Sequence, residues 1–261
     1  MKLKQHLKLF GQCARYEVMD RLDAAVAFWI VTGGTLINML MTVIFFKSLY
    51  LKTDRIGGWD ESRVLILLGT FFLIEALAWA TYIRGFNRLP RYIENGDLDV
   101  YLTKPVRLRT FLSYRFMDPM FLWPQILVAV GLIAYGAGRS GAPVNLLFYL
   151  LLLACALIIH RSLTIIFSTL NFFYIVPQTI YLAGELQKLG RYPITIYRGA
   201  VRLFLSVVVP VAAIYSLPPR ALVGDLSLLE AGGAVVLAAV FHFAGNALWD
   251  VSLKKYESVQ G

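Results

Sequence analysis

The sequence predicts an all-α membrane protein with six transmembrane helices, and three observations lead to this fold class. Hydrophobic residues make up 58% of the 261 residues and charged residues only 16%, whereas a soluble domain carries about 25% charged residues. The hydrophobic residues gather in runs of roughly twenty, the length that a helix needs to cross a bilayer. No polar stretch is long enough for a second domain, so residues 1–261 are expected to form one transmembrane permease domain.

The first expected element is an amphipathic helix over residues 1–23. Leu7, Phe10, Ala14 and Val18 recur near helical spacing, with basic residues between them. A basic amphipathic helix that leads into a membrane span lies at the interface between lipid and water. We therefore expect an interfacial leader helix rather than a solvated one.

Six apolar runs with no charge or a single ionisable residue follow the leader. A seventh run, 203–217, is shorter, and Pro210 at its centre predicts a kink because proline removes a backbone donor. This run is expected to be re-entrant on the outer side or, as the alternative, a full span. The six expected spans are residues 24–46, 64–83, 119–138, 142–159, 162–184 and 231–249.

A turn is needed between the fourth and fifth of these spans. A continuous helix over 142–184 would run about 64 Å, twice the bilayer core, so the chain must turn within it. His160-Arg161 is the only charged interruption, and a tight cytoplasmic hairpin is expected there. The alternative leaves Arg161 inside the membrane, where an arginine is costly, and makes 203–217 the next span.

Basic residues orient the array. The net charge is +9, and cytoplasmic segments of membrane proteins carry the excess of lysine and arginine. The leader, the loop 84–118 and the C-terminal tail are basic, so both termini are expected on the cytoplasmic side of a bacterial-type plasma (inner) membrane. Membrane lipid, not nucleic acid, is the expected partner of the basic residues. The hairpin leaves four of them outside, against the rule: Lys188, Arg191, Arg198 and Arg202.

The cytoplasmic loop contains a signal for a short helix. Pro90 suits the first turn of a helix and Gly96 suits its end, which predicts about two turns over residues 89–95. Such a helix would present Tyr92 and Ile93 among charges, below the membrane and between two spans. It could transmit a push from a soluble partner, or it could be an ordinary connecting segment.

Three sequence motifs resemble those of one protein family. The first is the run 93–99 (IENGDLD) with Leu102 and Lys104-Pro105-Val106; the second is the run 191–197 (RYPITIY) with Val209-Pro210 and Pro218 behind it. The third is the ending Trp249…Lys255-Tyr256-Glu257-Ser258. Together they resemble the type-2 ATP-binding-cassette (ABC) exporter permeases, and the resemblance covers nearly the whole chain.

The resemblance implies a fold, partners and a docking site. Its members have six spans with both termini inside, an amphipathic leader, and helices after the fifth span that dip into the outer leaflet. Two permease chains, identical or related, pair with two separate ABC-type ATPase subunits, which hold ATP and Mg. A coupling helix between spans two and three docks on the ATPase, and it maps here onto Leu89, Arg91, Tyr92, Ile93, Glu94, Gly96, Asp97 and Asp99.

The chain is not expected to be an enzyme. It contains no Gly-Lys pair, so the phosphate-binding motif G-x-x-x-x-G-K-[ST] cannot occur. Cys13 lies in the leader and Cys155 deep in an apolar run, which predicts neither a disulfide nor a metal site. We expect no cofactor on this chain and a permease that exports an apolar or amphipathic substrate with energy from its partner.

Two ionisable residues lie inside expected spans. Glu75 and His242 are at similar depth and could pair, and Asn246 lies one helical turn from His242. Ionisable residues within the membrane are functional candidates. The favoured interpretation is a buried hydrogen bond that fixes helix packing.

Two other classes of protein compete with the permease. An ion-coupled secondary transporter would show repeated halves and several charges at mid-membrane. The sequence shows no repeat, and only two ionisable residues lie at that depth. A rhomboid-like intramembrane serine protease would use Ser140 and His242. These two residues are expected about 15 Å apart in depth, too far for a nucleophile and its base.

Overall fold

The computed structural model describes residues 25–117, 119–173 and 179–256. The predicted leader helix, residues 1–23, lies outside them. Within the described residues the chain is helical and contains no strand, as the fold class requires. Ile56 and Trp59 form one isolated bridge in the loop after the first long helix.

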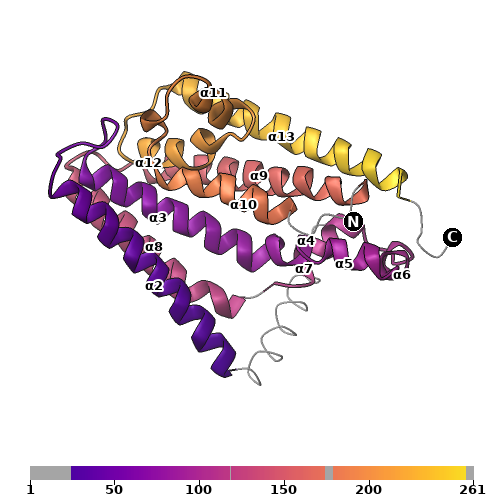
Figure 1. The fold of residues 1–261 in the computed structure, drawn as a ribbon. Helices are drawn as coiled ribbons and strands as arrows, with labels where there is room; N and C mark the ends of the chain where they lie inside the picture. The colour runs from indigo at the N-terminus through magenta and orange to yellow at the C-terminus, as the bar shows by residue number, and fades with distance from the viewer. Residues whose placement is uncertain (1–24, 118, 174–178, 257–261) are drawn as a thin grey trace.

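One side of the molecule is made of α2 (Ala25–Tyr50), α3 (Glu61–Ala78) and α8 (Pro119–Ser140). These helices lie side by side (Figure 1), and the packing of α3 along α8 is the most extensive in the protein. Asp60 caps α3 by accepting a hydrogen bond from the backbone N–H of Arg63. A π-helical turn, η1 (Trp79–Ile83), and α4 (Arg84–Phe86) continue α3 beyond its end.

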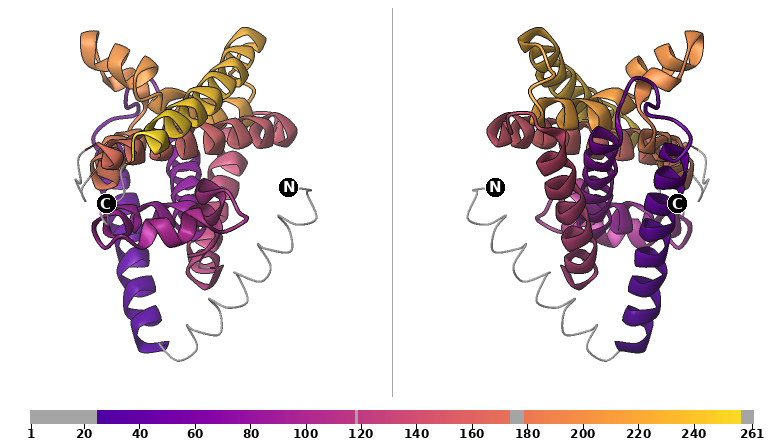
Figure 2. Two further views of the ribbon diagram at one scale, coloured as in Figure 1. Left: turned by 90° about the vertical axis from the view of Figure 1, so that its right-hand side faces the viewer. Right: turned by 90° about the vertical axis from the view of Figure 1, so that its left-hand side faces the viewer.

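The other side is made of α9 (Leu146–Thr169), α10 (Thr179–Lys188) and α13 (Leu228–Lys254). Both α10 and α13 pack against α9. Ser227 and Glu230 form a capping box that begins α13. The ribbon views place α2 and α13 on opposite sides of the bundle, with the main hydrophobic cluster between them (Figure 2).

The predicted hairpin at His160-Arg161 is wrong, because α9 runs through both residues without interruption. Side chains on other elements hydrogen-bond to both residues and so offset the free-energy cost of burying them within α9. His160 is buried and its Nδ1 lies 2.8 Å from Tyr82 Oη, while Arg161 Nη2 donates to Ser113 Oγ at 3.0 Å. The chain instead leaves α9 through a 3₁₀ turn, η2 (Leu170–Phe172), before α10.

The segment around Pro210 is bent, as predicted. It comprises α11 (Gly199–Val207), a π-helical turn η5 (Ala212–Ser216) and α12 (Leu217–Leu222), and its two halves meet at 74°. Such a pair is a broken span or a re-entrant loop. Two 3₁₀ turns connect α10 to it, η3 (Leu189–Arg191) and η4 (Ile194–Ile196).

Four helices of the described residues are long and apolar enough to cross a membrane, or five if the bent pair forms one span. The four candidate spans are α2, the helix that starts with α3, the helix that starts with α9, and α13. Six spans therefore remain a prediction. The 22 residues of α8 would be about 33 Å long at 1.5 Å per residue, enough to cross the hydrocarbon core.

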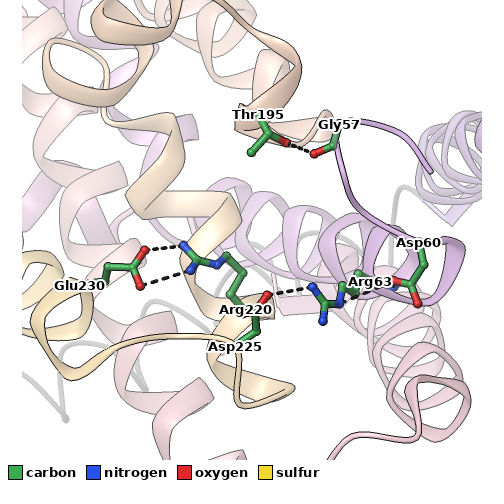
Figure 3. A network of polar contacts seen from close by, with 7 residues as sticks. All are labelled: Gly57, Asp60, Arg63, Thr195, Arg220, Asp225 and Glu230. Carbon is green, nitrogen blue, oxygen red and sulfur yellow. Dashed lines mark hydrogen bonds and ion pairs between the residues drawn. The ribbon is translucent and has the colours of Figure 1, made fainter.

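Polar contacts join the loops at one end of the bundle (Figure 3). Arg63 Nη1 lies 2.8 Å from Asp225 Oδ2, which ties the start of α3 to the loop after α12. Arg220 donates to both carboxylate oxygens of Glu230, at 2.6 and 3.2 Å, and so ties α12 to α13. These ion pairs connect the elements at the end of the bundle opposite α4.

Candidate functional site

A compact group of short helices forms the end of the molecule opposite the contacts of Figure 3. It consists of α4, α5 (Leu89–Glu94), α6 (Asp97–Leu102) and α7 (Leu108–Tyr114) (Figure 1). The predicted short helix is thus present, with Pro90 in its first turn. Gly96 follows it at φ +74°, a left-handed backbone conformation that residues with a Cβ rarely adopt.

The buried face of α5 and α6 differs from the prediction. Ile93 was expected to be presented to a partner, but it is only 4% exposed and packs with Leu89 and Leu98 in a second hydrophobic cluster. Tyr92 is half-buried, and its ring centroid lies 4.9 Å from that of Tyr101. The side chains that do reach the surface are Arg91, Glu94, Asp97, Val100 and Leu102.

Val100 and Leu102 were missed as surface residues of this segment. Val100 is 61% exposed and Leu102 is 41% exposed. Their alternation with Asp99 and Tyr101 gave no sign of which side chains face outward, because a six-residue helix is too short to show a periodicity. We call Arg91, Glu94, Asp97, Val100 and Leu102 the α5–α6 surface.

The α5–α6 surface is mechanically joined to three long helices. Helix α5 packs against η2 at the end of α9. Trp249 of α13 lies between Phe86 and Phe172, at ring distances of 5.7 and 5.2 Å. A Cβ on Gly85 would lie 1.7 Å from the Leu112 carbonyl oxygen, so α4 and α7 touch through their backbones.

Arg109 adds a polar link in the same region. Its Nη1 lies 3.8 Å from Asp250 Oδ1, which joins α7 to α13. Burial lowers the pKa of Arg109 from its usual range, and the Asp250 carboxylate opposes that shift. A force on this group of helices therefore reaches α3, α9 and α13 through side-chain contacts.

A polar cluster lies within the bundle at Glu75. Glu75 Oε1 accepts a hydrogen bond from Tyr215 Oη at 2.7 Å and lies 3.4 Å from His160 Nε2. The other ring nitrogen of His160 bonds to Tyr82. Four elements, α3, η1, α9 and η5, are thus fastened together by what we call the Glu75 cluster.

His242 is not the partner of Glu75, contrary to the suggested pairing. It lies 3.0 Å from Asn246 of its own helix, the one-turn contact that the spacing suggested. Its side chain also lines a cavity of about 340 Å³ together with Arg161. His160 and Tyr215 were missed as partners of Glu75 because they come from distant parts of the chain.

The residues of the protease alternative have separate local partners. Ser140 Oγ donates to the Ala137 carbonyl at 2.8 Å, in the last turn of α8. His242 Nε2 is engaged with Asn246 on α13. Across the part of the chain that the structure describes, no three His, Cys, Asp or Glu side chains converge as a metal site would require.

A cavity of about 360 Å³ opens beside the Glu75 cluster, between α2, α3, α8 and η3. A smaller cavity of about 110 Å³ lies next to it and shares Glu75, Trp79 and Lys188 as lining residues. The larger cavity also receives Gln125 and Arg191. Gln125 was missed, because a single amide in an apolar run gives no signal of its own.

Comparison with known families gives one match. A family described as ABC-2 family transporter protein matches residues 36–260, which includes the Glu75 cluster, Gln125 and Arg191 of the larger cavity, and the α5–α6 surface. Comparisons with curated proteins and with solved structures give no match.

Proposed function

Because the chain belongs to the ABC-2 transporter family, we propose that it is the permease subunit of an ATP-driven exporter. It is an integral membrane protein of several apolar helices. In this proposal it lies in a bacterial-type plasma membrane with both termini in the cytoplasm. A second permease chain and ABC-type ATPase subunits complete the transporter, and ATP and Mg are bound by the ATPase.

The observation that supports this function best is the α5–α6 surface. It carries charged side chains around an exposed valine and leucine, a composition suited to a protein partner. It is also packed firmly onto the ends of α3, α9 and α13. A partner that moves against it would move three long helices together.

The proposed mechanism follows from this connection. Closure of the ATPase subunits on ATP would displace the α5–α6 surface as a rigid body. Since α5 is packed against η2, whose Phe172 contacts Trp249 of α13, the displacement would change how the long helices pack against each other. Transitions of this kind switch between two packed arrangements rather than deform continuously. An apolar or amphipathic substrate would pass outward in the second arrangement.

The test is a pull-down from native membranes in mild detergent, with ATPase recovery as the readout. We expect an ABC-type ATPase to co-purify with the wild-type chain. Val100→Asp combined with Arg91→Glu should reduce recovery at least about tenfold, as the loss of an interface anchor does. Both side chains are exposed, so the variant should insert and fold normally, whereas a charge at the buried Ile93 would disturb folding instead.

Val144→Asp is the matched control. Val144 is 56% exposed and lies in the loop between α8 and α9, at the opposite end of the bundle. It should leave ATPase recovery unchanged. Equal recovery from the Val100 and Val144 variants would overturn the docking assignment.

An ion-coupled secondary transporter is the second candidate, and the Glu75 cluster is the observation that favours it. Ionisable groups within a membrane often mark ion pathways. The two candidates differ in their energy source. Proteoliposomes that hold the chain and its co-purified partners should export only with ATP; export driven by an ion gradient without ATP would favour the second candidate.

A further inference from the structure

The cavity of about 360 Å³ is lined by residues whose buried polar atoms have no hydrogen-bond partner in the part of the chain that the structure describes. Gln125 is 2% exposed, and neither its Nε2 nor its Oε1 makes a hydrogen bond. Arg191 Nε is likewise buried and unpartnered. Each buried polar group left without a partner costs about 1–3 kcal/mol, so such groups call for an explanation.

Three of the other polar residues of the cavity have partners, and Asn38 of α2 also lines it. Thr35 donates to the Val31 carbonyl at 2.9 Å. Lys188 pairs with Glu185 on its own helix. Glu75 Oε1 already has Tyr215 and His160 as partners, so this oxygen does not require a ligand. Gln125 and Arg191 carry the buried unpartnered atoms that a ligand would satisfy.

The walls of the cavity are apolar and partly aromatic. Phe71, Phe72 and Trp79 line one side, and Val31 and Met39 of α2 line the other. The Arg191 guanidinium lies 5.1 Å from the centre of the Phe71 ring, which holds it at the cavity. An apolar ligand body would contact these walls while a polar group reached Gln125 and Arg191.

We propose that this cavity binds an amphiphile with a single anionic headgroup, a carboxylate or a phosphate, which Arg191 and Gln125 hold while the apolar body lies against α2 and α3. The inference rests on the proposed function and names its substrate class. A guanidinium matches the geometry of carboxylate and phosphate oxygens, and the Gln125 amide donates a second hydrogen bond. The cavity is also lined by Lys188, which pairs with Glu185, and by the Glu75 carboxylate.

The volume limits the size of the ligand. Pockets for small molecules span about 300–1,000 Å³, so this cavity is at the lower end of the range. It fits a headgroup and the adjoining part of one apolar chain. The whole of a two-chain phospholipid would not fit, and a single-chain amphiphile is the better match.

The experiment uses the full chain in phosphatidylcholine nanodiscs, with radiolabelled dodecyl phosphate as the probe. We expect saturable binding that dodecanoate displaces and that dodecyltrimethylammonium and dodecanol do not. Arg191→Gln and Gln125→Leu should each weaken binding about ten- to a hundredfold, the range expected for hydrogen bonds to a charged group. Arg191→Lys keeps the charge and should lose less affinity than Arg191→Gln.

Arg198→Gln is the control for loss of positive charge. Arg198 is exposed at the start of α11 and does not line the cavity, so its removal should leave binding unchanged. Size-exclusion profiles check that each variant is folded. Equal binding of the cationic and anionic amphiphiles, no saturable binding at all, or unchanged affinity in folded Arg191→Gln would each overturn the inference.

The binding assay needs no ATPase, so a failure of the site and a failure of the proposed function can be told apart. Anion binding without a co-purifying ATPase would keep the site and remove the ATP-driven exporter. A co-purifying ATPase without anion binding would keep the exporter and remove the site.

Discussion

Two polar regions face the same cavity and differ in how their hydrogen bonds are completed. In the Glu75 cluster the carboxylate, the imidazole and the two phenols are joined to one another. Across the cavity, the Gln125 amide has neither a donor nor an acceptor among the residues that the structure describes. Apolar residues surround both regions, so exposure to water alone does not explain why the hydrogen bonds are complete in only one of them.

The difference separates a structural role from a binding role. Polar groups in an apolar medium stabilise packing when each is satisfied by another protein group, and they destabilise it when left unpaired. The Glu75 cluster therefore should contribute to stability. Gln125 should reduce stability and serve a ligand instead. Substitutions in the two regions are expected to change the free energy of unfolding in opposite directions.

The largest effect is expected for His160→Leu. It removes one partner of Glu75 and of Tyr82 from a fully buried position. Leaving a buried polar group without its partner costs about 1–3 kcal/mol, and more for a charged group, so the loss should appear as a lower midpoint of thermal unfolding in detergent.

The matched control is His242→Leu, the other described histidine within a long helix. Its hydrogen bond is a one-turn contact with Asn246 on an exposed face, and such bonds in membranes average about 0.6 kcal/mol. If both variants unfold at the same temperature, the Glu75 cluster has no special role in packing.

A smaller effect of opposite sign is expected for Gln125→Leu. Replacing the unpaired amide by an apolar side chain of similar size removes its desolvation cost, and should raise stability by about 1 kcal/mol. The same variant should bind dodecyl phosphate more weakly. A destabilised Gln125→Leu would show that the amide is satisfied in the folded protein, and would contradict the comparison.

The smallest effect is expected at the exposed end of the bundle. Arg63 and Asp225 pair at 2.8 Å, but their side chains are 38% and 48% exposed. Exposed ion pairs contribute about 0–1 kcal/mol, so Arg63→Gln should lower the unfolding midpoint by little. Added salt should reduce even this difference, while leaving the effect of His160→Leu in place.

Much of the fold could be predicted from local sequence. The long helices α2, α3, α8 and α13 follow the apolar runs, and Gly96 ends α5 as its backbone freedom suggests. These features depend on hydrophobicity and on backbone preference, which neighbouring residues reveal. The bend at Pro210 belongs to the same class.

The errors concern residues whose partners are far away in the chain. His160 resembled a loop residue because Glu75 and Tyr215, which complete its surroundings, come from other helices. Glu75 was matched with His242 on depth alone, and depth says nothing about which face of a helix a residue occupies. Ile93 was placed among charges in sequence, but the fold turns it inward.

Lys188 and Trp79 border both the larger and the smaller cavity. An anion that moved from one cavity to the other would remain beside the same ammonium group throughout. Carrying a bare charge through an apolar medium costs tens of kcal/mol by Born solvation in a medium of ε about 4. The Lys188 ammonium would lower that barrier without any water-filled passage, whereas the Glu75 carboxylate, which also borders both cavities, would oppose it.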